Sequence, residues 1–190
     1  VDSEQNNSNE VLVEVVVTDN AGNQTKEQLE LQIDVTPPEI MISYDNNAPD
    51  SDSYYKETRV ATISVSERNF DPELVLVDIT NTDGPIPVLS NWTESGGGGN
   101  GDDTVHSATI SYEEDGDYTF EVECTDMADN QAEEITFEPG TVNEKEFTID
   151  QTLPEISVSY DNNDVYNEKY FKEGRVATVT IREHNFVRDR

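Results

Sequence analysis

An internal repeat constrains this chain more than any other feature of its sequence. Residues 33–70 return without a gap as residues 149–186, and 21 of the 38 aligned positions are identical. The offset of 116 residues is the length of one small β-sandwich domain, and similarity at a fixed period is the signature of a repeat architecture. The chain therefore carries parts of several copies of one structural unit.

A second, shorter repeated segment indicates where one copy ends and the next begins. Residues 17–23 resemble residues 124–130, and both contain the pattern Thr-Asp-x-Ala-x-Asn. Their offset is 107 residues, so one copy has gained nine residues, which we place near the turn-forming residues 138–140. The two repeated segments predict the last strands of one unit in residues 1–35, a complete unit in 36–151, and the first strands of another in 152–190.

Composition narrows the range of partners. The chain has 11 Lys and Arg residues and 42 Asp and Glu residues, which gives a formal net charge of -31. Phosphates would be repelled, so we exclude nucleic acid as a partner and do not expect binding to anionic membrane surfaces. No long apolar stretch is present, and we expect no membrane insertion in this segment.

Strand-like alternation runs through the predicted complete unit. Apolar residues occupy every second position in several short segments, with polar residues between them, which is typical of half-buried strands. Their inward-facing positions are Ile40, Ile42 and Tyr44; Ala61, Ile63 and Val65; Val75, Val77 and Ile79; Ala108, Ile110 and Tyr112; Tyr118, Phe120, Val122 and Cys124; and Ile135, Phe137, Phe147 and Ile149 in one interrupted final strand. About seven short strands separated by turns predict an all-β, immunoglobulin-like β-sandwich in a tandem array.

Three motifs carry a resemblance to a known family. Glu114-Asp115-Gly116-Asp117-Tyr118 is similar to the turn that precedes an immunoglobulin tyrosine corner, with Tyr118 as the corner residue. The Thr-Asp-x-Ala-x-Asn turn and the Asp-x-Thr-x-Pro-x-Ile linker of residues 34–40 complete the set. With them the whole chain resembles the bacterial immunoglobulin-like repeats of large surface proteins and adhesins.

The resemblance implies a stalk or spacer outside the cell. Such domains are strung end to end on a bacterial surface or in a secreted protein, and each unit's first partners are its neighbouring repeats. Proline restricts its own backbone and that of the preceding residue, so the short linkers at 34–38 and 150–154 predict stiff joints. A host or cell-surface protein or a glycan would be the target of the adhesion that the resemblance implies.

Acidic and amide side chains suggest a calcium site at each joint. In an immunoglobulin topology the linker and two of the loops meet at one end of the domain, so the oxygen-bearing side chains of this region should converge. The candidate ligands are Asp34, Glu67, Asn69, Asp71, Asp126, Asp129 and Asn130. Calcium takes six to eight oxygen ligands, and the return of Asp34 as Asp150 and of Glu67 as Glu183 places a candidate site at every joint.

A plainer interpretation of the same residues stays open. Asp and Asn in loops usually cap turns through their own backbone, and an acidic chain gathers some of them by chance. The triplet 45–47 and its copy 161–163 invite the same interpretation, and we predict that they form such turns.

Aromatic residues supply the rival function, a carbohydrate- or protein-binding module of an adhesin or of a secreted multidomain enzyme. Trp92, Tyr54 and Tyr55 lie in loop-rich stretches, where exposed rings can stack on sugars. The alternative for all three is packing. Trp92 is the only tryptophan, for which core or sheet-edge packing is the usual role. Tyr54 and Tyr55 return as Tyr170 and Phe171, and the second change keeps the ring and loses the hydroxyl group.

Catalysis has little support in the sequence. His106 and His184 belong to different units, and Cys124 faces inward in its strand pattern. A buried cysteine behaves as a small apolar residue rather than as a nucleophile. We therefore expect that this segment is not an enzyme.

Overall fold

The computed structural model describes residues 7–82, 84–96 and 104–186 and is built from strands. Within these ranges the one helical segment is a 3-10 turn, η1 (Pro72–Leu74). No helix among the described residues is long and apolar enough to cross a membrane. The prediction of an all-β protein is confirmed.

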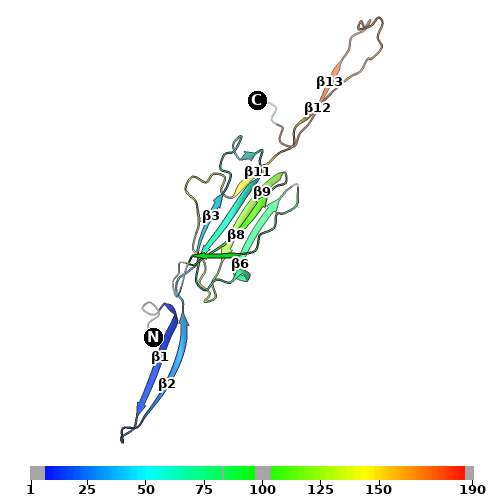
Figure 1. Cartoon of the computed structure of the whole chain (residues 1–190). Helices are drawn as coiled ribbons and strands as arrows, with labels where there is room; N and C mark the ends of the chain where they lie inside the picture. The colour runs from blue at the N-terminus through cyan, green and yellow to red at the C-terminus, as the bar shows by residue number, and fades with distance from the viewer. Residues whose placement is uncertain (1–6, 83, 97–103, 187–190) are drawn as a thin grey trace.

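Two sheets form the central body (Figure 1). The five-stranded sheet has the order β10 (Ile135–Phe137), β3 (Glu39–Tyr44), β5 (Arg59–Ser66), β8 (Thr104–Tyr112), β7 (Thr93–Gly96). The four-stranded sheet has the order β4 (Tyr54–Tyr55), β11 (Glu146–Ile149), β9 (Gly116–Cys124), β6 (Val75–Asn81).

The two sheets share one hydrophobic core. Every second residue of β3, β5 and β9 is buried, as the alternating sequence predicts. Residues of both sheets belong to the same buried cluster, and the rings of Tyr112 on β8 and Tyr118 on β9 meet edge to face at 5.0 Å between centroids. The Tyr118 hydroxyl donates a hydrogen bond of 2.8 Å to the carbonyl of Glu114, as predicted for a tyrosine corner.

The predicted final strand is wrong in one respect, because its two halves lie in different sheets. β10 pairs in parallel with β3, whereas β11 pairs antiparallel with β9 and in parallel with β4. Between the halves, the amide of Thr141 donates to the carbonyl of Glu138, and Gly140 has a φ of 95°. The extra residues of this copy give the chain enough length to cross from one sheet to the other.

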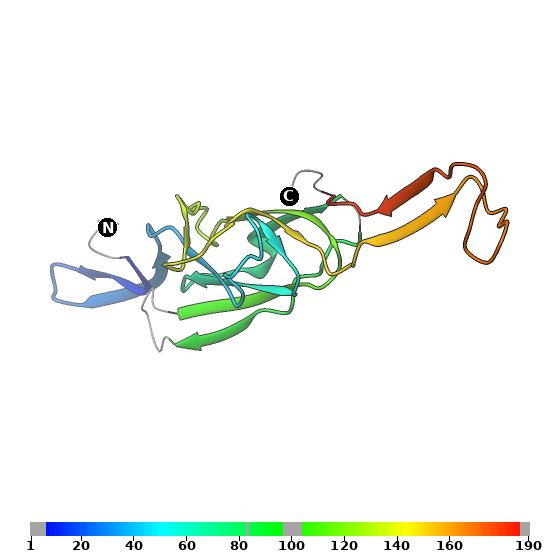
Figure 2. The same cartoon turned by 90° about the horizontal axis from the view of Figure 1, so that it is seen from above.

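A two-stranded hairpin projects from each end of the body (Figures 1 and 2). The N-terminal hairpin pairs β1 (Ser8–Thr18) with β2 (Gln24–Ile33), and the C-terminal hairpin pairs β12 (Glu155–Tyr160) with β13 (Ala177–Arg182). We call the junction at residues 34–38 the first joint and the junction at residues 150–154 the second joint.

The most strongly repeated motif encloses a buried arginine. The Arg59 side chain is fully buried, and its guanidinium carbon lies 3.6 Å from the ring centroid of Tyr44 and 4.6 Å from those of Tyr55 and Phe147. Burial lowers the pKa of this guanidinium, while the rings attract its charge through their electron-rich faces.

Hydrogen bonds complete the surroundings of Arg59. Its guanidinium donates to four oxygens, which are the carbonyls of Asn46, Val142 and Asn143 and the side-chain oxygen of Asn47. The predicted turn is confirmed, because the side chain of Asn46 accepts from the amide of Ala48. The triplet 45–47 therefore both turns the chain and holds the arginine.

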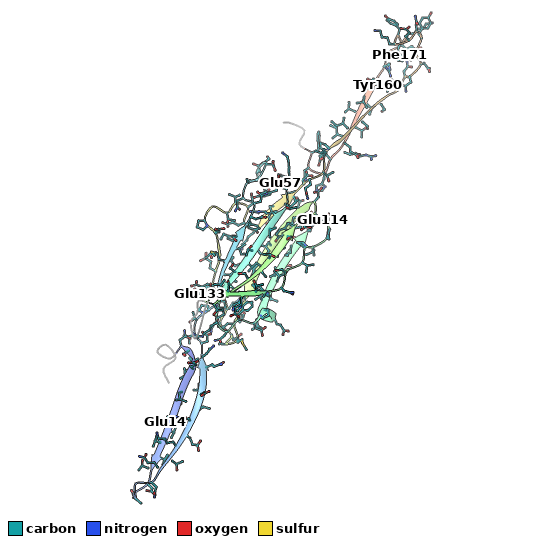
Figure 3. All side chains as sticks on the ribbon, in the orientation of Figure 1. Glu14, Glu57, Glu114, Glu133, Tyr160 and Phe171 are labelled. Atoms are coloured by element: carbon teal, nitrogen blue, oxygen red, sulfur yellow. The ribbon has the colours of Figure 1, made fainter. Side chains whose placement is uncertain are left out.

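The copy of this motif in the C-terminal hairpin keeps two of the three ring contacts and two of the four hydrogen bonds. The Arg175 guanidinium lies 3.8 Å from the ring centroid of Tyr160 and 4.0 Å from that of Phe171, and it donates to the carbonyl of Asn162 and the side chain of Asn163. Figure 3 shows Tyr160 and Phe171 toward the far end of this hairpin. The part of the motif that repeats is therefore local to one hairpin, whereas the third ring and two carbonyls around Arg59 come from residues 142–147.

Replacing Arg59 with methionine should destabilise the protein by about 4 kcal/mol, because four acceptors lose a charged donor at about 1 kcal/mol each. Denaturant unfolding followed by the fluorescence of Trp92 would measure the change. Lys56→Met is the matched control, since its ion pair with Asp50 is exposed and should contribute little. Equal effects of the two substitutions would contradict the role of Arg59.

Candidate metal centre at the first joint

Three carboxylates from distant parts of the sequence meet at the first joint. Asp34 follows β2, Glu67 follows β5 and Asp126 follows β9, and one oxygen of each lies within 4.8 Å of the others. The side chains of all three are almost completely buried. This carboxylate cluster could hold a metal ion, because oxygen ligands in a closed site suit hard cations.

Local turns fix two of the three carboxylates. Asp126 accepts hydrogen bonds of 2.8 Å from the amides of Ala128 and Asn130 and from the Asn130 side chain. Glu67 accepts a bond of 2.6 Å from the amide of Asn69. Side-chain acceptors of this kind stabilise a turn and also set the direction of the carboxylate.

The two predicted asparagines lie beside the cluster and donate to it. The Asn69 amide group donates to Asp34 at 2.5 Å, and that of Asn130 donates to the backbone carbonyl of Asp34 at 3.3 Å. The side-chain oxygen of Asn69 accepts from Asn9 of the N-terminal hairpin at 2.7 Å. Both asparagines therefore tie the linker to the central body in addition to lining the cluster.

Arg68 is the functional residue that the sequence analysis missed. Its guanidinium lies 3.1 Å from an Asp34 carboxylate oxygen, and the side chains of the two residues are 4% and 2% exposed. It also donates to Asn7 at 2.5 Å and to the carbonyl of Ile33 at 3.2 Å, so it joins the body to the hairpin. Arg68 thus brings one positive charge to a group of three carboxylates, which leaves the acidic side chains in excess around the candidate metal centre.

The other two predicted ligands serve as turn residues. The Asp71 carboxylate caps η1 by accepting from the amide of Glu73 at 2.9 Å. Asp129 is exposed and has a φ of 70°, and the corresponding residue of the N-terminal hairpin is Gly22, with a φ of 88°. The turn interpretation holds for these two positions, and the cluster does not include them.

The second joint repeats part of this arrangement. The Asn185 side chain donates to Asp150 at 3.0 Å, and the Asn185 amide donates to Glu183 at 3.0 Å, which reproduces the geometry around Asp34 and Glu67. Among the described residues no counterpart of Asp126 reaches this joint. In its place a cleft of about 480 Å³ opens beside Asp150 and Glu183.

The aromatic residues proposed as ligand contacts divide between core and surface. Tyr55 is 1% exposed and packs in the core, so its ring is closed to a sugar. Trp92 is half-buried, and its ring lies 5.0 Å from that of Phe70 between centroids. Tyr54 alone of the three is exposed, at 38%, and it borders the cleft of the second joint.

Comparison of the chain with protein-family models, with curated proteins and with solved structures gave no match.

Cys124 gives a test of how closed this end of the domain is. Burial, with the charges of Glu67 and Asp126, raises the pKa of its thiol to about 11. At pH 8 about one thiol in a thousand would be ionised, against about one in four in the unfolded chain, where the pKa is near 8.5. Alkylation of the native protein should therefore be about 200-fold slower. Between pH 8 and pH 10 the native rate should rise about tenfold per pH unit, since the thiolate is the reacting form.

Mass spectrometry after timed iodoacetamide treatment would measure this rate, with the denatured chain as the control. Equal rates for native and denatured protein at pH 8 would show that the thiol is open to solvent.

Proposed function

We propose that this chain is a segment of a tandem array of immunoglobulin-like domains, a non-catalytic stalk of a bacterial surface or secreted protein that acts in adhesion. Residues 36–151 form the one complete domain of the segment, and the flanking hairpins belong to neighbouring repeats. The observation that carries the proposal is a contact that both joints share: Asn69 binds Asp34 and Glu67 at the first joint, and Asn185 binds Asp150 and Glu183 through the same hydrogen bonds at the second.

At both joints a polar side chain close to the start of a strand of one unit is hydrogen-bonded to the linker that leads to the next. Asn7 accepts from the amide of Val35 at 3.3 Å and donates to the hydroxyl of Thr36 at 2.5 Å. At the second joint Asp115 accepts from the amide of Gln151 at 2.8 Å and from the hydroxyl of Thr152. A contact built twice in one chain favours a joint with a fixed geometry over a flexible tether.

The strand order supports the immunoglobulin-like assignment. In chain order the strands β3, β5, β6, β7, β8, β9 and β11 can be lettered A to G. One sheet then contains the order A-B-E-D and the other G-F-C, which is the arrangement of a seven-stranded immunoglobulin domain. The hydrogen bond from Tyr118 to Glu114 lies at the predicted corner between E and F.

The shape and charge suit a spacer. The hairpins extend from opposite ends of the body, so successive units would continue along one axis (Figure 1). The net charge of -31 keeps such a chain soluble and discourages collapse of one unit onto another. The oxygen-only ligand set of the carboxylate cluster favours calcium as the ion at the first joint.

Calorimetric unfolding in calcium and in chelator tests the stalk with calcium joints. A free calcium concentration about 100-fold above the dissociation constant would add about 2.7 kcal/mol to the stability of the complete unit. At roughly 4 to 8 °C per kcal/mol for a domain of this size, the midpoint should rise by more than about 10 °C.

Two acidic substitutions separate a specific site from general screening of charge. Asp126→Asn removes one carboxylate of the cluster and should abolish most of the calcium-dependent rise in midpoint. Asp71→Asn changes the charge equally at a position outside the cluster, and the rise should persist. An equal rise in both variants, or no rise in the unaltered chain, would reject calcium at the joint.

A further inference from the structure

Within the described residues the central body has four sheet edges, which differ in length. In the five-stranded sheet the edges are β10, with three residues, and β7, with four. In the four-stranded sheet they are β4, with two residues, and β6, with seven. A short edge strand offers little backbone for another chain to pair with, and proteins commonly limit unwanted pairing in this way. β6 does not have this protection.

The sequence of β6 also lacks the usual defences of an edge strand. It reads Val-Leu-Val-Asp-Ile-Thr-Asn, with no proline, glycine or lysine. All seven residues pair with β9 in one uninterrupted register, so no bulge bends the edge away from a partner. A regular edge that is rich in β-branched residues is a template on which another extended segment can pair.

The direction of the backbone groups shows which of them face the open side of β6. On β9 the amide of Phe120 donates to the carbonyl of Lys145, on the side away from β6. Backbone groups alternate in direction along a strand, so the residue after Phe120 faces β6, where its partner is Asp78. Val77 and Ile79 therefore direct their N–H and C=O groups away from β9, to the side on which no strand lies among the described residues.

Side chains along this edge alternate between an apolar face and an acidic face. Val75 and Val77 pack against the core cluster and are only half-buried. On the other face Asp78 lies directly opposite Glu121, with Glu123 two residues along β9, and all three are exposed. Like charges that face each other on neighbouring strands destabilise a sheet. A positive side chain on a third strand beside Asp78 would relieve this repulsion.

We propose that β6 is an interaction edge, on which an extended segment of a partner protein adds as an antiparallel fifth strand of the four-stranded sheet. The segment has apolar residues at every second position and lysine or arginine between them. Its apolar residues lie opposite Val77 and Ile79, exchange backbone hydrogen bonds with them and cover the border of the core. Its basic residues lie beside Asp78 on the acidic face.

Charge selects this partner over a second copy of the chain. Two β6 strands paired with each other would set two acidic faces side by side, and each copy carries a formal charge of -31. A basic segment is attracted by the same field, which also raises the rate of encounter. The backbone hydrogen bonds then hold any extended segment, while the alternation of apolar and basic side chains determines which segment is recognised.

Titration of the 190-residue chain with the peptide Lys-Val-Lys-Val-Lys-Val-Lys, blocked at both ends, tests the edge in the presence of chelator. Calorimetry would measure the affinity, and hydrogen exchange followed by NMR would locate the contact. Binding should slow exchange of the amides of Val77 and Ile79, because these N–H groups gain acceptors on the peptide.

Two methylated peptides separate strand pairing from attraction of charge. Directly opposite residues exchange the hydrogen bonds, so the valine N–H groups of the bound peptide point to β6 and the lysine N–H groups point to solvent. Methylation of the valine nitrogens should weaken binding by at least about tenfold, because several hydrogen bonds are lost. Methylation of the lysine nitrogens leaves the charge and these bonds unchanged, and binding should persist.

Two charge reversals test the acidic face. Asp78→Lys should weaken binding of the unmethylated peptide by about tenfold, because an attraction becomes a repulsion. Glu57→Lys is the matched control. It makes the same change of charge at an exposed residue just after β4, which is the opposite edge of the same sheet, and should change the affinity by less than about twofold.

Equal binding of the two methylated peptides, or binding without protection of Val77 and Ile79, would reveal attraction of charge alone and overturn the inference. Absence of binding, or equal losses in the two charge variants, would also overturn it. The edge lies within residues 36–151 and uses none of the residues of the two joints. Calcium-dependent stabilisation of the first joint is therefore a separate test, and either proposal can fail without the other.

Discussion

The buried carboxylate of Asp34 determines how the N-terminal hairpin meets the central body. Asp34 lies in a linker that belongs to neither, and removal of its charge from water is unfavourable unless nearby groups compensate. Compensation comes from Arg68 and Asn69 of the body, and Arg68 at the same time donates to Asn7 and Ile33 of the hairpin. Because one guanidinium serves both sides, a swing of the hairpin would expose or separate buried charges, and the electrostatics of one residue thereby fix the angle of the joint.

The charge of the buried arginine in the core is compensated in a different way from that of Asp34. Among the described residues no carboxylate forms an ion pair with Arg59, whose guanidinium instead contacts three aromatic faces and four neutral oxygens. The Arg59 site is built from residues of the central body alone, whereas the surroundings of Asp34 combine residues of the body with residues of the N-terminal hairpin. The return of the motif around Arg175 agrees with this, because the arginine and its rings come together within one hairpin.

Residues with a strong local signal were predictable from the sequence. Alternation of apolar residues located β3, β5, β6, β8 and β9 because a half-buried strand imposes a period of two. The convergence of Asp34, Glu67 and Asp126 followed from the repeat and the expected topology. The crossing of the final strand between sheets was missed, since short apolar segments on either side of an insertion look alike whichever sheet they join.

Side-chain roles were harder to predict than strand positions. Asp71, Asp129 and Asn130 are all oxygen-bearing loop residues, and only three-dimensional geometry separates a residue that caps a turn from one that lines the cluster. The sequence does not predict the role of Arg68, because a basic residue in an acidic chain suggests a surface position. The repeat has His184 at the corresponding position, which also suggests a surface position. The significance of Arg68 lies in its burial, which no local pattern encodes.

Repulsion between acidic side chains and hydrogen bonding at the joints act over different distances in this molecule. That difference accounts for its extended form. Acidic side chains are spread along the whole length, as the positions of Glu14, Glu133, Glu57 and Glu114 illustrate (Figure 3). Their repulsion reaches about 8 Å at physiological salt, while the hydrogen bonds of the joints act at about 3 Å between groups already in contact. Attraction therefore prevails where neighbouring units touch, and repulsion prevails between surfaces that merely approach. The hydrogen bonds therefore hold the chain at its joints, and the repulsion between acidic side chains opposes folding of the chain back on itself.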